Sequence, residues 1–130
     1  MEEKLIRFAD LDKEEFRRLR LKMVEMLTAF DDFCHENGLQ YFLTNGTCLG
    51  AIRHKGFIPW DDDMDIALPR EDYERLFEIW PNQGNKYQLL KPGKTTLTGV
   101  HIAQLRDSTT TCIYEYAKNY DICHGVKIDI

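Results

Sequence analysis

Residues 58–69, with the sequence IPWDDDMDIALP, restrict the fold more than any other part of the chain. Pro59 and Pro69 leave little room between them for a long helix, because proline breaks a helix interior. Aspartates occupy positions 61, 62, 63 and 65, and an alternation of apolar and polar residues typical of a strand follows them. Like charges this close repel one another, so the segment needs either a bound cation or full solvation.

A strand at residues 64–68 would sort these side chains onto two faces, because side chains alternate along a strand. Met64, Ile66 and Leu68 would face the core, and Asp63 and Asp65 would project together from the other face. Two neighbouring carboxylates suit Mg²⁺, which takes one or two of them and completes an octahedron with phosphate oxygens and waters. The pattern therefore predicts a Mg²⁺ site, with Mn²⁺ as the alternative ion.

The aspartates have three alternative interpretations. An EF-hand loop that begins at Asp61 needs Gly at its sixth position and Glu at its twelfth, where this chain has Ile66 and Asp72. A DDxxD motif formed by Asp61, Asp62 and Asp65 works on a helix, which the two prolines and the strand-like alternation disfavour. The third interpretation, a solvated acidic turn, is compatible with the sequence.

The tail VKIDI alternates in the same way. Val126, Ile128 and Ile130 would lie on one face of a strand, with Lys127 and Asp129 on the other. A carboxylate between two isoleucines is costly unless it faces a polar site. If a neighbouring strand brings Asp129 beside the other two aspartates, the three carboxylates can hold two metals for in-line phosphoryl displacement. An outward-facing strand aspartate is the alternative.

The sequence NGTCLG offers a candidate phosphate site. Gly46 and Thr47 are expected between a strand and a short helix, where backbone N–H groups and the helix N-terminus favour an anion. Ordinary turn chemistry is the alternative. Three cations follow, Arg53, His54 and Lys55, which either neutralise a substrate diphosphate or pair with the aspartates.

Two further residues near the candidate site have open roles. Arg106, in QLRDSTTT, is a candidate anion clamp, with a surface strand arginine as an equal alternative. Trp60 is expected to pack against the acidic loop rather than to stack on a base.

The remaining patterns predict an α+β fold with a mixed sheet flanked by helices, as one domain over residues 1–130. Asp12 and Glu15 form a capping-box sequence, an amphipathic helix follows from Phe16, and Asn37-Gly38 ends it. We also expect a helix at 48–54, a loop at 55–62, a helix at 70–80 with Pro69 in its first turn, and further strands at 39–43, 87–90, 99–106, 110–116 and 125–130.

Composition argues against several other classes of protein. The net charge of −5 disfavours a nucleic-acid binder, which usually has a basic face. The charged N-terminus contains no secretory signal, and no apolar run is long enough to span a membrane, although peripheral association stays open. The four cysteines form no C-x-x-C pair, which disfavours a zinc site and favours reduced thiols in the cytoplasm.

Taken together, these residues resemble the LicD family, which is related to fukutin and its relatives. The stretch YFLTNGTCLGAIRHKGFIPWDDDMDIALPREDYERL is similar to the family's signature almost throughout, and LRDSTTT and VKIDI fit the same family. The resemblance implies the nucleotidyltransferase fold of the DNA polymerase β superfamily, with a Gly-[Gly/Ser] turn, an Asp-x-Asp strand and a carboxylate on a later strand. Those features map to Gly46-Thr47, Asp63-x-Asp65 and Asp129, with Thr47 a mild departure.

The resemblance also implies an activity: Mg²⁺-dependent transfer of phosphocholine or a similar phospho-alcohol from a CDP-activated donor to a cell-surface glycan, teichoic acid or lipopolysaccharide. Asp63 and Asp65 would ligate the metal, and Asp129 would hold a second ion or act as a base. A nucleotidyltransferase that acts on an NTP and a non-catalytic nucleotide-binding fragment are the alternatives. Family members are longer than this chain and VKIDI stops in mid-pattern, so we expect the N-terminal catalytic part of a longer protein.

Overall fold

The structure is a computed structural model that describes residues 10–93 and 102–130. Its longest element is helix α1, Lys13–Asn37, which begins at the expected capping box: the Asp12 side chain accepts from the Glu15 N–H, and Glu15 accepts from the Asp12 N–H. Gly38 ends the helix in the left-handed region, with φ at 65°, as the sequence predicts.

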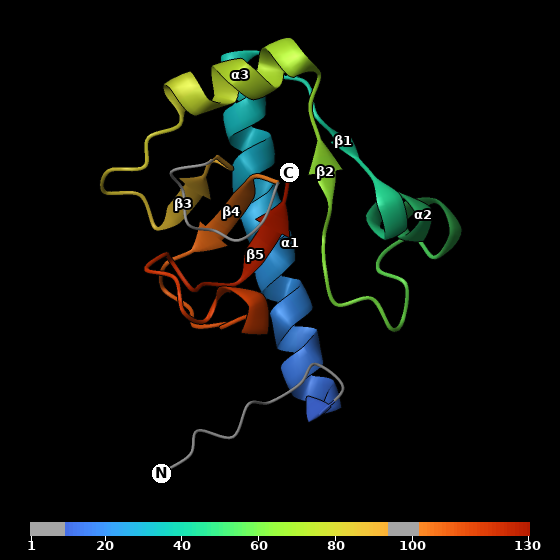
Figure 1. Ribbon diagram of the computed structural model, residues 1–130. Coiled ribbons are helices and arrows are strands. Elements are labelled where there is room, and N and C mark those ends of the chain that lie inside the picture. The colour runs from blue at the N-terminus through green and yellow to red at the C-terminus, as the bar shows by residue number, and fades with distance from the viewer. Residues whose placement is uncertain (1–9, 94–101) are drawn as a thin grey trace.

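Two small antiparallel sheets lie beside α1. One pairs β1 (Phe42–Leu43) with β2 (Ile66–Ala67), and the other has the order β3 (Tyr87–Leu90), β4 (Gln104–Asp107), β5 (Lys127–Asp129). Helix α1 runs along one face of the three-stranded sheet, and α3 (Arg70–Ile79) crosses near its C-terminal end (Figure 1). The α+β class is confirmed. The parallel component of the expected mixed sheet is a single bridge between Asp65 and Asp129, which joins the two sheets.

The core lies between α1 and the sheets, and it explains why these segments alternate. Apolar side chains from both sheets are buried against α1: Met64, Ile66, Leu89, Leu105 and Ile128 pack with Met23, Met26, Phe30 and Cys34. The predicted inward faces of residues 64–68 and 126–130 are therefore confirmed, and their partners at 63, 65, 127 and 129 are left to the opposite, polar side. The burial of one apolar stripe on each element fixes the strand register.

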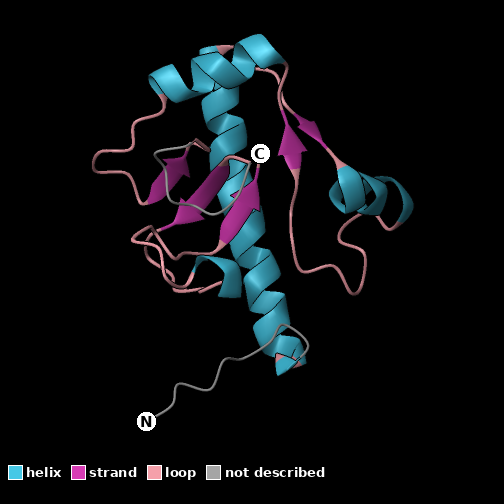
Figure 2. Cartoon of the chain, in the orientation of Figure 1, coloured by secondary structure: helices cyan, strands magenta, loops and turns pink. Residues whose placement is uncertain are grey.

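Several expected elements differ from the structure, and the strand expected at 64–68 is reduced to Ile66–Ala67 (Figure 2). The strand at 39–43 is reduced to Phe42–Leu43, and helix α2 begins earlier than expected, spanning Asn45–Arg53. Gly46 and Thr47 thus lie in the first turn of α2 rather than in a turn before it. Pro69 is the N-cap of α3, one position before its first turn.

The strand expected at 110–116 is wrong. Thr110 instead closes a turn, because its N–H and hydroxyl both donate to the Asp107 carbonyl, at 3.2 and 2.8 Å. The chain then continues without a strand into a short 3₁₀ helix, Glu115–Ala117. The strand expected at 99–106 is observed from Gln104, and its residues before 102 lie outside the described part of the chain. Within the described residues, no helix is both long and apolar enough to cross a membrane.

Candidate functional site

The structure brings together three carboxylates from separate parts of the chain. Asp65 and Asp129 face each other across the parallel bridge, and the Asp129 N–H donates to the Met64 carbonyl at 3.0 Å. One carboxylate oxygen from each of Asp63, Asp65 and Asp129 lies within 4.8 Å of the others. This is the convergence that the two alternating segments predict. The roles of the three residues as metal ligands and catalytic groups stay predictions.

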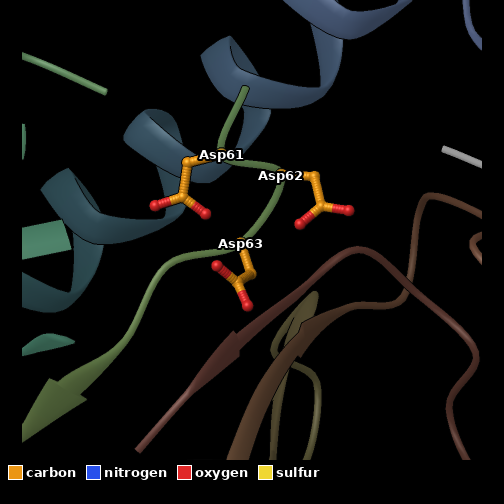
Figure 3. A group of neighbouring side chains, drawn as sticks. All are labelled: Asp61, Asp62 and Asp63. Carbon is orange, nitrogen blue, oxygen red and sulfur yellow. The ribbon is translucent and has the colours of Figure 1, made fainter. Parts of the chain in front are cut away.

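A second acidic group overlaps the first through Asp63. Oxygens of Asp61, Asp62 and Asp63 also lie within 4.8 Å of one another, on the loop that enters β2 (Figure 3). Strand alternation did not select Asp61 and Asp62 as site residues, because the extended segment begins after them. The density of aspartates in the sequence was the signal that could have found them.

The carboxyls of Asp63 and Asp65 both have raised pKa values, because they are partly desolvated and lie close to other aspartates. Burial of the carboxyl, a hydrogen bond with Asp61 and the charges of its acidic neighbours raise the pKa of Asp63 to about 7. Burial and the charge of Asp129 raise the pKa of Asp65 as well. Carboxylate oxygens of three aspartates converge here, the ligand type that hard divalent cations prefer, and Lys127 Nζ contacts one of them, Asp129 Oδ2. The donor set therefore fits Mg²⁺ or Mn²⁺.

The N-terminus of α2 adjoins these carboxylates. Thr47 is buried, and its hydroxyl oxygen accepts from the Asp65 N–H at 2.9 Å, so it holds Asp65 in place. A Cβ at Gly46 would lie 2.7 Å from Asp61 Oδ2, which shows how closely the backbone approaches that carboxylate. The Thr44 side chain makes no capping hydrogen bond at this end of α2, where the N–H groups of the first turn carry the positive end of the helix dipole, which favours an anion.

Arg20 of α1 binds the backbone of the acidic loop, a contact that sequence reasoning missed. Its guanidinium donates to the carbonyls of Ile58, Pro59 and Asp61 at 2.8, 2.8 and 2.9 Å, and its Nε donates to the Asp61 carbonyl at 3.2 Å. It also lies 4.1 Å from the centre of the Phe16 ring. An arginine on an amphipathic helix looks like an ordinary surface residue, so no sequence signal identified this contact.

The structure does not bring the three predicted cations into the carboxylate cluster. Arg53, His54 and Lys55 are exposed at the C-terminal end of α2, about 10 Å along the helix axis from Gly46. Among the described residues, none of the three forms an ion pair with the aspartates. Their phosphate-binding role stays a prediction. The expectation that Trp60 packs against the loop is wrong, since Trp60 is 76% exposed.

Arg106 is fully buried, so the surface alternative is wrong. Its guanidinium donates to Gln104 Oε1 from Nε at 3.0 Å and from Nη2 at 2.6 Å, and it lies 5.5 Å from the centre of the Tyr114 ring. The chain at 112–117 covers this part of β4, which strand alternation did not reveal. Arg106 reaches the carboxylate cluster only through Gln104, and its role as an anion clamp stays a prediction.

A cleft elsewhere on the chain holds none of the predicted site residues. It lies at the C-terminal end of α1 and is lined by Asp31, Cys34, His35 and residues 38–43.

The carboxylates of Asp63, Asp65 and Asp129 cluster beside the N-terminus of α2. This arrangement is a candidate site for a divalent cation and a phosphate group, and it places the chain among proteins with such a site. The chain belongs to the LicD family, described as the LicD/FKTN/FKRP nucleotidyltransferase domain, whose model matches residues 38–118. The resemblance seen in the sequence is thus confirmed. The matched segment contains all the predicted site residues except Asp129, which lies beyond it.

Several known proteins are similar to the chain. Lipopolysaccharide cholinephosphotransferase LicD of Haemophilus influenzae is 34% identical over 87 residues, which cover 67% of this chain and 33% of that protein. Mannosyltransferase regulator 4 of Saccharomyces cerevisiae is 26% identical over 133 residues, covering 92% of this chain and 10% of that protein. Human ribitol 5-phosphate transferase FKRP is 49% identical over 35 residues, 27% of this chain and 7% of that protein. The chain therefore spans a third or less of the length of these relatives.

Proposed function

We propose that this chain carries the catalytic site of a Mg²⁺-dependent phosphotransferase. The enzyme would transfer phosphocholine or a similar phospho-alcohol from a CDP-activated donor to a hydroxyl group of a cell-surface glycan, such as lipopolysaccharide or teichoic acid. The observation that carries the proposal is the convergence of Asp63, Asp65 and Asp129 within 4.8 Å. Two similar proteins, which are named as a cholinephosphotransferase and a ribitol 5-phosphate transferase, support the reaction class.

The residues would divide the work as follows. Asp63 and Asp65 would hold Mg²⁺, or Mn²⁺ in its place, which supplies positive charge against the phosphate oxygens. The N–H groups at Gly46 and Thr47 would orient the donor phosphates at the start of α2. The diphosphate would be neutralised by the three exposed cations at the end of α2, Arg53, His54 and Lys55. Arg106 would add a buried positive charge on β4, next to Gln104.

The proposed step is a single displacement at phosphorus. The acceptor hydroxyl forms a new P–O bond to the phosphorus that carries the alcohol, and the bond from that phosphorus to CMP breaks. The hydroxyl proton passes to a carboxylate, for which Asp129 is the candidate base if it does not hold a second ion. Most of the rate enhancement in such reactions comes from positioning and from stabilising developing charge.

Product analysis tests this proposal against its alternatives. The full-length natural protein is incubated with Mg²⁺ and CDP-choline, CDP-ribitol, CDP-glycerol or CTP, and the release of CMP or pyrophosphate is followed. CMP release that depends on a glycan acceptor and falls at least 100-fold in Asp65→Asn is the expected result. Asp32→Asn, which changes an exposed aspartate of α1, is the matched control.

Two other outcomes would identify the alternatives. Pyrophosphate release from an NTP would show a nucleotidyltransferase. No turnover with any donor would favour a non-catalytic nucleotide-binding module, and the yeast relative, named as a regulator, makes this control necessary.

A further inference from the structure

Behind the carboxylate cluster lies a buried polar network on the outer face of β4 and β5. The strand register places Gln104 opposite Asp129 and Arg106 opposite Lys127. All four side chains point away from the apolar core, yet they are only 1%, 9%, 0% and 8% exposed, in that order. Charged groups this buried are costly unless they are paired and hydrogen-bonded, so their partners matter.

Gln104 connects Arg106 to Asp129. Because a guanidinium has donors only, the Gln104 amide must turn its oxygen towards Arg106, with contacts at 3.0 and 2.6 Å. The Gln104 nitrogen then faces the other way and donates to Asp129 Oδ1 at 3.1 Å. The same nitrogen lies 3.2 Å from the Tyr116 hydroxyl. Arg106 therefore fixes the direction of the amide, and the amide fixes the Asp129 carboxylate.

Lys127 contacts the second oxygen of the Asp129 carboxylate. Its Nζ forms an ion pair and a hydrogen bond with Asp129 Oδ2, and it lies 5.0 Å from the centre of the Tyr114 ring. Both oxygens of Asp129 thus accept from groups of this chain. By contrast, no lysine or arginine among the described residues forms an ion pair with Asp63 or Asp65. The three carboxylates of the cluster are not equivalent.

We propose that Lys127 is a built-in cation of the site, which neutralises Asp129 and limits the cluster to one divalent cation, held by Asp63 and Asp65. Gln104 and Arg106 are positioning residues that hold Asp129 in contact with Lys127. The inference rests on the proposed function, because it concerns the same metal site. Within the group of Asp63, Asp65 and Asp129, Lys127 balances one carboxylate through its ion pair with Asp129, which leaves two carboxylates to hold one divalent cation. A second divalent ion at Asp129 would have to displace the ammonium group or lie against it, and like charges that close repel strongly.

The test counts Mn²⁺ ions bound per chain by electron paramagnetic resonance, with Mn²⁺ as the only added ligand. The wild-type protein is expected to bind one ion. Asp65→Asn is expected to weaken binding at least 10-fold, and Asp129→Asn less than threefold, because asparagine still accepts from Lys127. Lys127→Met, which removes the charge and keeps an unbranched chain, is expected to raise the count from one to two. Lys127→Arg is the matched control and should keep the count at one.

The role of Gln104 in positioning Asp129 is tested by combining a Gln104 substitution with Lys127→Met. In Gln104→Leu, Asp129 loses one of its two donors but keeps Lys127, so the folded protein should still bind one ion. This variant should unfold at lower urea than the wild type, because the buried Arg106 loses Gln104 Oε1 as its acceptor. In the double variant Gln104→Leu, Lys127→Met, the second ion should bind at least threefold more weakly than in Lys127→Met alone. A purely structural role for Gln104 would not change the affinity of the second ion, and that result would overturn the positioning role.

The outcomes separate this inference from the proposed function. Two ions bound by the wild-type protein would overturn the inference, and this result does not depend on whether any variant folds. A Lys127→Met protein that folds and still binds one ion would also overturn it. If the wild-type protein binds one ion but shows no transfer from a CDP-alcohol, the proposed function fails and the inference stands. If it binds none, both fail.

Discussion

Replacement of Asp63 by asparagine should stabilise the metal-free protein. In the folded chain the pKa of the Asp63 carboxyl is raised from 3.8 to about 7, so ionisation of this group at neutral pH works against folding. A shift of this size would correspond to about 4 kcal/mol for a fully buried group, at about 1.4 kcal/mol per unit. The Asp63 residue is exposed, however, and water screens its neighbours' charges, so we expect about 1–2 kcal/mol.

The size of this stabilisation depends on pH. Below about pH 4 the carboxyl is protonated in the folded and the unfolded chain, and Asp63 costs nothing. Between about pH 4 and pH 7 the folded chain retains a proton that the unfolded chain has released, so stability falls as pH rises. Above pH 7 the full cost is present. Asp63→Asn should therefore match the wild type at low pH and exceed it by about 1–2 kcal/mol at pH 8.

Urea unfolding in EDTA at pH 4.5 and pH 8, with and without Mg²⁺, would measure this. A ligand at 100 times its Kd stabilises the native state by about 2.7 kcal/mol. Mg²⁺ should give this gain to the wild type and little of it to Asp63→Asn, so that the order of stability reverses when the ion is added. Asp32→Asn should follow the wild type throughout. If Asp63→Asn is less stable than the wild type in EDTA at pH 8, or if Mg²⁺ stabilises both proteins equally, the electrostatic reasoning is refuted.

Three further substitutions test how the loop and sheets hold the site. Arg20→Ala should lower the free energy of unfolding by about 2 kcal/mol, because the hydrogen bonds of Arg20 are lost, and it should speed amide hydrogen exchange at residues 58–63. Arg20→Lys should not restore protection from exchange, because lysine lacks the planar guanidinium. Unchanged exchange in Arg20→Ala would contradict the role of Arg20. Gly46→Ala places a Cβ 2.7 Å from the flexible end of Asp61, so unfolding in urea should change by less than about 1 kcal/mol while Mn²⁺ affinity falls; equal affinity would show that Asp61 does not matter. Gly125→Ala places a Cβ 1.9 Å from the Asp107 carbonyl oxygen, a backbone atom, and should destabilise by about 3 kcal/mol in the same assay; a loss under 1 kcal/mol would contradict the packing.

Local sequence rules predicted the parts of the fold that depend on local physics. The capping box at Asp12 and the left-handed Gly38 bound α1 as expected, because both signals act through contacts a few residues apart. The alternation at 64–68 and at 126–130 predicted which residues face the core, since burial on one face is what such a pattern reports. It also predicted that Asp63, Asp65 and Asp129 would share a face, although the single parallel bridge that joins them was not foreseeable.

The predictions that were wrong, a strand at 110–116 and an exposed Arg106, concern places where one segment of the chain covers another. Residues 110–116 are rich in Thr, Ile and Tyr, which favour strands, but hydrogen bonds from Thr110 to Asp107 turn the chain instead. The chain that follows lies over the outer face of β4, which is why Arg106 is buried rather than exposed. Neither contact has a periodic signature, because both depend on where the chain returns after a turn.

The contrast among the acidic residues supports the proposed cation site over a solvated loop at positions 61–65. Asp107 is buried, which raises its pKa, but hydrogen bonds from Thr109 and the charge of Lys22, 3.4 Å away, outweigh this and lower the pKa overall. Asp129 has Lys127 and Gln104 as partners. The two buried carboxylates, Asp107 and Asp129, thus each have a lysine as an ion-pair partner and a hydrogen-bond donor. At Asp63 the neighbours are other aspartates, and the pKa is raised to about 7. Arg20 meanwhile donates to the carbonyls of Ile58 and Asp61 and so restrains the backbone of the same loop. A restrained loop loses less conformational entropy when it binds a ligand than a flexible one does, which favours the proposed cation site.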